Sequence, residues 1–208
     1  MNVIQRLWQM ILGWGSVGVV YTLAGYLQPS ARSVVPETAL DRLIPFNPIG
    51  IWLYLSFFAL IPLAYLRCAP HRLRWLARSM QLSALVSGVV YVLHPTTLAY
   101  PALPLGDSAS ATALRWLISF DSAQNCLPSL HGSLTALAME SLLPARTRAR
   151  TALLWLWGIG IAFAVIQTRR HLAIDLSAGM LAGWLCGRVV NLLFVPTALC
   201  ITTRSSAS

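Results

Sequence analysis

Six long apolar stretches follow one another along the chain, separated by short segments rich in proline, glycine and charged residues. A run of roughly 18 or more apolar residues is typical of a helix that crosses a membrane, and turn-formers and charges mark the ends of such helices. The pattern therefore predicts an all-α bundle of six transmembrane helices, over residues 9–27, 49–66, 78–94, 129–143, 151–168 and 172–195.

The longest predicted connection, residues 95–128, contains an apolar segment with partly helical spacing from Ala109 to Phe120. One interpretation is a short helix that lies in the membrane interface. The alternative is a capping helix with no part in the chemistry. The pattern leaves both open.

Composition supports a membrane protein. Of the 208 residues, 57% are hydrophobic and 10% are charged, whereas soluble domains carry about 25% charged residues. We expect one integral membrane domain over residues 1–208.

The four cysteines show no metal-ligand spacing, and we expect no cofactor and no metal.

The fifteen basic residues are all arginine, and they cluster between the apolar runs. Such clusters do not form the basic face with interleaved aromatics that nucleic-acid binding needs, so we expect no nucleic-acid partner. If the N-terminus is cytoplasmic, ten arginines lie inside and five outside, as the positive-inside rule requires. We therefore expect a multi-pass protein of a bacterial inner (plasma) membrane, with both termini in the cytoplasm and with the outer side holding residues 28–48, 95–128 and 168–171.

Three ionisable residues stand at the ends of predicted helices. His131 opens the fourth, whereas His171 and Asp175 open the sixth and are four positions apart, one helical turn. From His131 the chain runs inward to residue 144 and returns from residue 151. Each leg measures roughly 20–27 Å at the helical rise, close to the bilayer thickness of about 30 Å. The spacing predicts that the three side chains meet at the outer membrane-water interface.

Two histidines and a carboxylate can carry out phosphoryl transfer. An aspartate one turn from a histidine can accept its ring N–H, which leaves the other ring nitrogen to attack an electrophile. A second histidine can protonate the leaving group. Catalytic roles are therefore predicted for His131, His171 and Asp175.

The surrounding sequence resembles the type 2 phosphatidic acid phosphatase superfamily. Residues 125–131, Asn-Cys-Leu-Pro-Ser-Leu-His, are similar to its P-S-x-H signature, and residues 168–179 are similar to H-x-x-x-D-x-x-x-G. The stretch 41–48, Asp-Arg-Leu-Ile-Pro-Phe-Asn-Pro, resembles the branch of inositol phosphorylceramide synthases. The resemblance covers a core of about residues 40–195.

This resemblance implies that His171 forms a phosphohistidine, that Asp175 orients it and that His131 is the general acid. It also implies phosphate contacts from Ser129 and from the backbone as far as Gly132, near a helix N-terminus. The superfamily's K-x-x-x-x-x-x-R-P signature is absent, because the chain has no lysine. The nearest candidates to replace its phosphate clamp are Arg169, Arg170 and Arg115.

The expected function is hydrolysis of a membrane phospholipid or polyprenyl (di)phosphate, with the lipid phosphate and the bilayer as partners. One alternative is a phosphotransferase that passes a phospho-headgroup to a lipid alcohol. The other is a catalytically silent lipid-binding protein, which the missing signature favours. The sequence does not indicate the oligomeric state.

Overall fold

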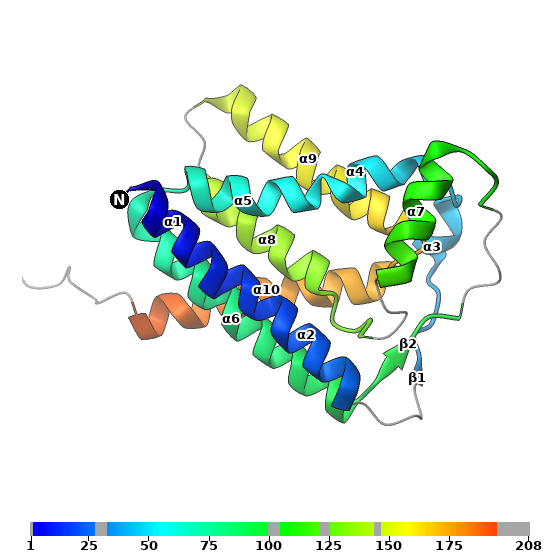
Figure 1. The fold of residues 1–208 in the computed structure, drawn as a ribbon, viewed down its shortest axis with the longest axis horizontal. Coiled ribbons are helices and arrows are strands. Elements are labelled where there is room, and N and C mark those ends of the chain that lie inside the picture. The colour runs from blue at the N-terminus through cyan, green and yellow to red at the C-terminus, as the bar shows by residue number, and fades with distance from the viewer. Residues whose placement is uncertain (1, 28–32, 100–104, 121–124, 144–146, 195–208) are drawn as a thin grey trace, which may run out of the picture.

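The protein is described by a computed structural model over residues 2–27, 33–99, 105–120, 125–143 and 147–194. Within these ranges it is a bundle of helices with one pair of two-residue strands (Figure 1), so the predicted all-α class is confirmed. In chain order the elements are α1 (Val3–Met10), the π-helical turn η1 (Ile11–Gly15), α2 (Ser16–Leu27), β1 (Ser33–Val34), α3 (Ala39–Leu43), the 3-10 turn η2 (Pro48–Gly50), α4 (Ile51–Leu55), α5 (Phe57–Arg67), α6 (Pro70–Leu93), β2 (Thr96–Thr97), α7 (Ala109–Phe120), α8 (Leu130–Leu142), α9 (Arg148–Gln167) and α10 (Ala173–Phe194).

Among the described residues, five helical stretches are long and apolar enough to cross a membrane: Val3–Leu27, Pro48–Arg67, Pro70–Leu93, Arg148–Gln167 and Ala173–Phe194. The fourth predicted span is the helix α8, which has 13 residues and is therefore only about 20 Å long. This is shorter than the hydrocarbon layer, so six spans are not confirmed. The coarser conclusion, a multi-pass membrane protein, stands on the other five.

The third span begins eight residues earlier than predicted, at Pro70 rather than residue 78. The arginines of this stretch indicated a connection, but arginine is a good helix former and proline suits the first position of a helix. The connection between α5 and α6 is therefore only Cys68 and Ala69.

Helix α8 forms the centre of the bundle and packs against α5, α6, α9 and α10. Its contact with α10 is close because glycines face backbone on the other helix. A Cβ atom added to Gly132 would lie 2.5 Å from the Leu176 carbonyl, and one added to Gly183 would lie 2.6 Å from the Ser133 carbonyl. Small residues allow such an approach between membrane helices, and it places the starts of α8 and α10 side by side.

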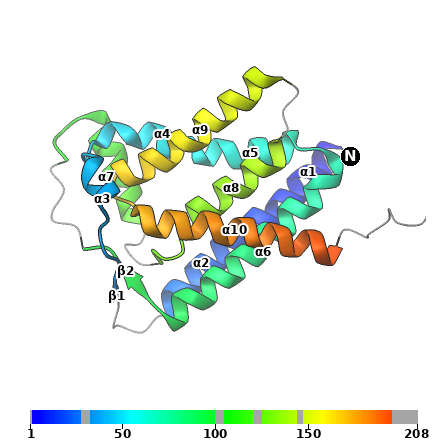
Figure 2. The same cartoon turned by 180° about the vertical axis from the view of Figure 1, so that it is seen from behind.

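The two ends of the bundle differ (Figures 1 and 2). One end, here called the loop end, holds β1, β2, α3, α7 and the starts of α8 and α10. There β1 and β2 pair in parallel, with Ser33 opposite Thr96. The other end, here called the basic end, holds the start of α1, the α5–α6 connection and the start of α9. The described parts of the loops predicted to share one side, residues 33–48, 95–99, 105–120, 125–128 and 168–171, do lie together. The side of the membrane they face remains a prediction.

Candidate active site

His131, His171 and Asp175 meet at the loop end, as the helix spacing predicted. The Nδ1 atom of His131 lies 3.2 Å from Nε2 of His171, and Nδ1 of His171 lies 2.8 Å from Oδ2 of Asp175. Asp175 has no exposed surface and His171 is only 7% exposed. Because burial excludes water, the hydrogen bonds between these side chains are electrostatically stronger than hydrogen bonds at the protein surface.

Asp175 is held by the first turn of its own helix. Its Oδ1 atom accepts the backbone N–H of Leu176 at 3.1 Å, so the other oxygen, Oδ2, faces His171. A carboxylate in this position accepts a hydrogen bond from the Nδ1–H group, which leaves Nε2 of His171 as the basic nitrogen. Nε2 is the atom that points towards His131.

Tyr54 of α4 completes the cluster, although it is not among the site residues predicted from the sequence. Its hydroxyl lies 2.8 Å from Nε2 of His131, and the Tyr54 side chain is fully buried. The ring of Phe57 packs against the His131 ring, with centroids 4.9 Å apart. A tyrosine in an apolar helix carries no signal of its own, because only tertiary packing brings it to a histidine 77 positions away.

One arrangement of protons satisfies all three contacts. The Tyr54 hydroxyl donates to His131, His131 donates from Nδ1 to Nε2 of His171, and His171 donates from Nδ1 to Asp175. Each ring is then neutral with one donor and one acceptor nitrogen. The result is a continuous hydrogen-bonded chain in which the lone pair of His171 Nε2 is directed at a proton on His131.

Ser129 and Gly132, the two predicted phosphate contacts at the start of α8, have structural roles in this arrangement. Ser129 is the N-cap of α8, and its hydroxyl accepts the Gly132 N–H at 3.3 Å. Its backbone N–H donates to the Asp175 carbonyl at 2.9 Å. This last bond joins the two signature segments directly. Phosphate contacts of Ser129 and Gly132 stay predictions.

Packing accounts for the glycine at position 179, the last residue of the H-x-x-x-D-x-x-x-G pattern. Ser129 lies directly against this residue, and a Cβ atom added to Gly179 would overlap the Ser129 carbonyl. Any side chain here would therefore push α10 away from the start of α8. The glycine lets Asp175 and His131 approach from two helices.

The segment before α8 is anchored by three neighbouring elements. The Tyr91 hydroxyl donates to the Pro128 carbonyl, and the Leu127 N–H donates to the Thr96 hydroxyl at 3.0 Å. Asn125 has a φ of 62°, a left-handed conformation in which asparagine is enriched. Its side-chain amide donates to the Tyr21 carbonyl at 3.2 Å. These contacts fix the direction in which α8, and with it His131, begins.

Arg169, a predicted phosphate ligand, is bound to the protein itself. It has a φ of 57°, and its guanidinium donates to the Asp41 carbonyl at 2.8 Å and the Ile44 carbonyl at 3.0 Å. Glu37 lies 3.8 Å away. These contacts clamp the junction that carries His171 onto α3. Its phosphate role stays a prediction, and its positioning role was not expected.

Asp41 is the second part of this clamp. The carboxylate is fully buried and accepts three hydrogen bonds, from the Thr38 N–H and hydroxyl at 2.8 and 2.6 Å and from the Ala173 N–H at 2.7 Å. Ala173 is the first residue of α10, where backbone N–H groups lack partners in the helix. The sequence did carry a signal, because a carboxylate in an apolar chain with only six acidic residues is costly and rarely without a role.

The other two predicted phosphate ligands are Arg170 and Arg115. Arg170 is half-buried beside His171 in the sequence. Arg115 is exposed on α7 and donates to the Gly106 carbonyl at 2.7 Å and the Thr112 hydroxyl at 3.2 Å. Helix α7 covers the loop end and is linked to α4 by a hydrogen bond from Trp52 to Ser110. Its helical structure matches the prediction for residues 109–120.

The part of the chain that the structure describes contains no group of three or more His, Cys, Asp or Glu side chains arranged to hold a metal ion. Compared with models of known protein families, the chain matches none, and it matches no curated protein sequence.

Proposed function

We propose that the protein is a lipid phosphate phosphatase that acts through a phosphohistidine on His171. The observation that carries the proposal is the contact chain Tyr54–His131–His171–Asp175 at one end of a bundle of membrane-length helices. It supplies a nucleophile held by a carboxylate and a proton donor within 3.2 Å of it. The resemblance to the type 2 phosphatidic acid phosphatase superfamily implies catalytic roles for three of these residues, His131, His171 and Asp175.

In the first step, Nε2 of His171 attacks phosphorus and the bond from phosphorus to the lipid oxygen breaks. The leaving oxygen takes a proton from His131, which enters this step as the imidazolium with both ring nitrogens protonated, and Asp175 stabilises the positive charge that develops on His171. The lipid leaves as an alcohol, or as a phosphate if the substrate is a diphosphate. His131 is then a neutral imidazole.

In the second step, water gives a proton to His131 and attacks phosphorus, and the bond between phosphorus and Nε2 breaks. Inorganic phosphate leaves, and both histidines return to their starting state. The same residue thus serves as acid and then as base.

The contact between the His131 and His171 rings occupies the place where the phosphoryl group would bind. Reacting atoms need to come within about 3–3.5 Å, but His131 Nδ1 already occupies that distance from His171 Nε2. The His131 ring therefore has to turn aside when the phosphoryl group binds. It is only half-buried, which leaves room for this movement.

We further propose that the loop end faces the outer compartment and that α8 lies inside the bundle as a sixth, short membrane segment. The arginines at the basic end support this orientation by the positive-inside rule. The outer membrane-water interface would then be where a lipid phosphate meets His171.

The test uses the full protein in detergent with EDTA present and a panel of phosphatidate, phosphatidylglycerophosphate and polyprenyl diphosphates. We expect release of phosphate from one class. His171→Ala should abolish release and prevent formation of an acid-labile, alkali-stable phosphoprotein. His94→Ala is the matched control, because His94 is an exposed histidine at the same end of the bundle. Turnover that survives His171→Ala would remove the mechanism.

The role of His131 can be separated from that of His171 with an aryl phosphate, whose leaving group needs no proton. His131→Ala should lose turnover of the lipid but still form phosphohistidine from the aryl phosphate. His171→Ala should form none from either.

A phosphotransferase is a second candidate, which the resemblance of residues 41–48 to the inositol phosphorylceramide synthase branch favours. It would use the same first step and replace water by a lipid alcohol in the second. Mass spectrometry of the lipid products separates the two, because only transfer yields a new phosphodiester or phosphorylated lipid. A lipid-binding protein without activity is the third candidate. Lack of turnover and of phosphohistidine across the panel would favour it.

A further inference from the structure

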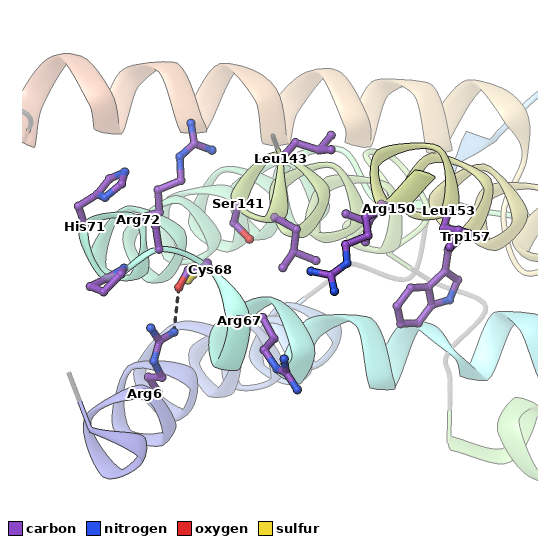
Figure 3. Close-up of a pocket in the computed structure, with 14 residues that line it drawn as sticks. Arg6, Arg67, Cys68, His71, Arg72, Ser141, Leu143, Arg150, Leu153 and Trp157 are labelled. Carbon is purple, nitrogen blue, oxygen red and sulfur yellow. Dashed lines mark hydrogen bonds between the residues drawn. The ribbon is translucent and has the colours of Figure 1, made fainter. Parts of the chain in front are cut away.

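A cavity of about 860 Å³ opens at the basic end of the bundle (Figure 3). His171 lies at the opposite end. Its wall comes from α1, the α5–α6 connection, the end of α8 and the first turns of α9. Among the described residues, four arginines line it, Arg6, Arg67, Arg72 and Arg150. Its volume lies in the range of small-molecule sites, so it is large enough for a phospholipid headgroup and the start of a chain.

Two of these arginines hold helix ends together. Arg6 donates to the Tyr65 and Cys68 carbonyls at 2.8 and 3.0 Å, and Arg72 donates to the Glu140 carbonyl and lies over the Trp75 ring. They satisfy carbonyls that the last turns of α5 and α8 leave open. Their role is structural.

Arg67 and Arg150 are different. Both are exposed, and within the described ranges neither side chain has a hydrogen bond or an ion pair. Figure 3 shows the Arg150 guanidinium between α9 and the end of α5, and both side chains line the same cavity. Two guanidinium groups with unused donors are suited to a phosphate, which accepts several charge-assisted hydrogen bonds.

The charge of the cavity wall is uncompensated. None of the described residues that line it is an aspartate or a glutamate. Glu140 directly precedes Ser141 of the cavity wall in the sequence. Its carboxylate pairs with Arg188 at 3.9 Å and not with an arginine of the cavity. Burial raises the pKa of the Cys68 thiol, so this residue is neutral at pH 7 and adds no negative charge.

Backbone dipoles add to the positive potential. The first turn of α6 lines the cavity, and its N-cap residue Ala69 makes no side-chain capping bond. The N-terminus of a helix carries a partial positive charge and unpaired N–H groups that favour anions. An anion bound near His71 and Arg67 would interact with this partial positive charge and with these N–H groups.

An apolar wall distinguishes a lipid from a soluble anion. Leu153, Leu154 and Trp157 of α9 also line the cavity. From Arg150 to Trp157 the helix rises about 10 Å, so the cavity extends from its basic rim along a surface that faces the hydrocarbon layer. A soluble phosphate would leave this surface uncovered, whereas an acyl chain would cover it.

We propose that this cavity binds an anionic phospholipid of the leaflet at the basic end, with the headgroup phosphate between Arg67 and Arg150 and an acyl chain along Leu154 and Trp157. The site is separate from the His171 site and does not depend on the proposed function. It would hold the ends of α5, α8 and α9 in their relative positions.

Native mass spectrometry of the full protein in detergent tests the proposal. The probes are phosphatidylglycerol, phosphatidylcholine with the same chains, and glycerol phosphate without chains. We expect phosphatidylglycerol to bind at least tenfold tighter than the other two. In the double variant Arg67→Gln/Arg150→Gln the affinity for phosphatidylglycerol should fall by roughly 30-fold, since each arginine near a membrane surface contributes about fivefold.

Arg148→Gln is the matched control, because it removes the same charge from the first turn of α9 at a residue outside the cavity. It should change affinity by less than about twofold, and His171→Ala should leave binding unchanged. If the double variant fails to fold, the single variants Arg67→Gln and Arg150→Gln should each show part of the loss. Equal losses in Arg148→Gln, or equally tight binding of glycerol phosphate or of phosphatidylcholine, would overturn the proposal.

Discussion

The Oδ1 atom of Asp41 accepts the backbone N–H of Ala173 at 2.7 Å, across 132 positions of the chain. Ala173 is the first residue of α10 and lies midway between His171 and Asp175. A short helix of five residues, α3, thereby sets where α10 begins. The geometry of the candidate nucleophile thus depends on a residue that does not touch it.

We therefore expect Asp41→Asn to lower both stability and turnover. The amide offers one acceptor oxygen in place of two, so an NH₂ group would face a donor. A buried donor left without a partner costs about 1–3 kcal/mol, and a small displacement of His171 should lower kcat by about tenfold. Thermal unfolding and phosphate release measure the two effects. Asp107→Asn, at an exposed position of the same end, should change neither.

Removing the Tyr54 hydroxyl tests its contact with His131. In Tyr54→Phe the His131 ring loses the partner of its Nε2 atom. We expect kcat to fall by up to about tenfold, the worth of one hydrogen bond, with little change in KM. Tyr65→Phe is a good control, since it removes a buried hydroxyl from α5 that contacts Met80 instead. Equal kinetics in the two variants would mean that Tyr54 only packs.

Asp175→Asn tests the tautomer of His171. The amide keeps the size of the side chain but can present an N–H₂ group to Nδ1, which would place the imidazole proton on Nε2 and remove the nucleophile. A loss of about 10⁴-fold in kcat accompanies this change in a Ser-His-Asp triad, and we expect at least about 10²-fold here. Rapid-quench measurement of phosphohistidine should show that its formation slows by the same factor. Unchanged formation would contradict the assigned role.

Gly179→Ala tests the contact between α8 and α10. The added methyl group would overlap the Ser129 carbonyl, and overpacking of this kind costs about 1–3 kcal/mol. We expect a lower midpoint of thermal unfolding together with reduced turnover. Gly18→Ala on α2 has open space around it and should be neutral or slightly stabilising. If both variants unfold alike, the close approach of the two helices is not needed for stability.

Labelling of single cysteines tests the proposed orientation. In a chain without its native cysteines, Ser110→Cys on α7 should react with a membrane-impermeant maleimide in intact cells. Arg148→Cys at the start of α9 should react only after the membrane is made permeable. The prediction follows from the cluster of arginines at the basic end. The opposite pattern would place His171 in the cytoplasm.

Spacing along the chain was enough to predict that His131 and His171 would meet. One helix leads away from His131 and the next returns, and legs of similar length bring their ends to one side. The same arithmetic did not reveal α8 as the centre of the bundle, because its 13 residues look like any other apolar run. The charge of residues 72–78 likewise predicts an exposed connection, whereas these residues form the first turns of α6.

What the sequence determined by itself is the set of apolar runs, and with them the helices, the connections that share an end and the proximity of the two histidines and the aspartate. These follow from local periodicity and from the fixed rise of a helix. Only the tertiary structure decided that Tyr54 contacts His131, that Arg169 and Asp41 clamp the start of α10, and that Arg67 and Arg150 share a cavity. Such contacts join residues far apart in the chain, and they depend on how whole helices pack and turn, which no local pattern records.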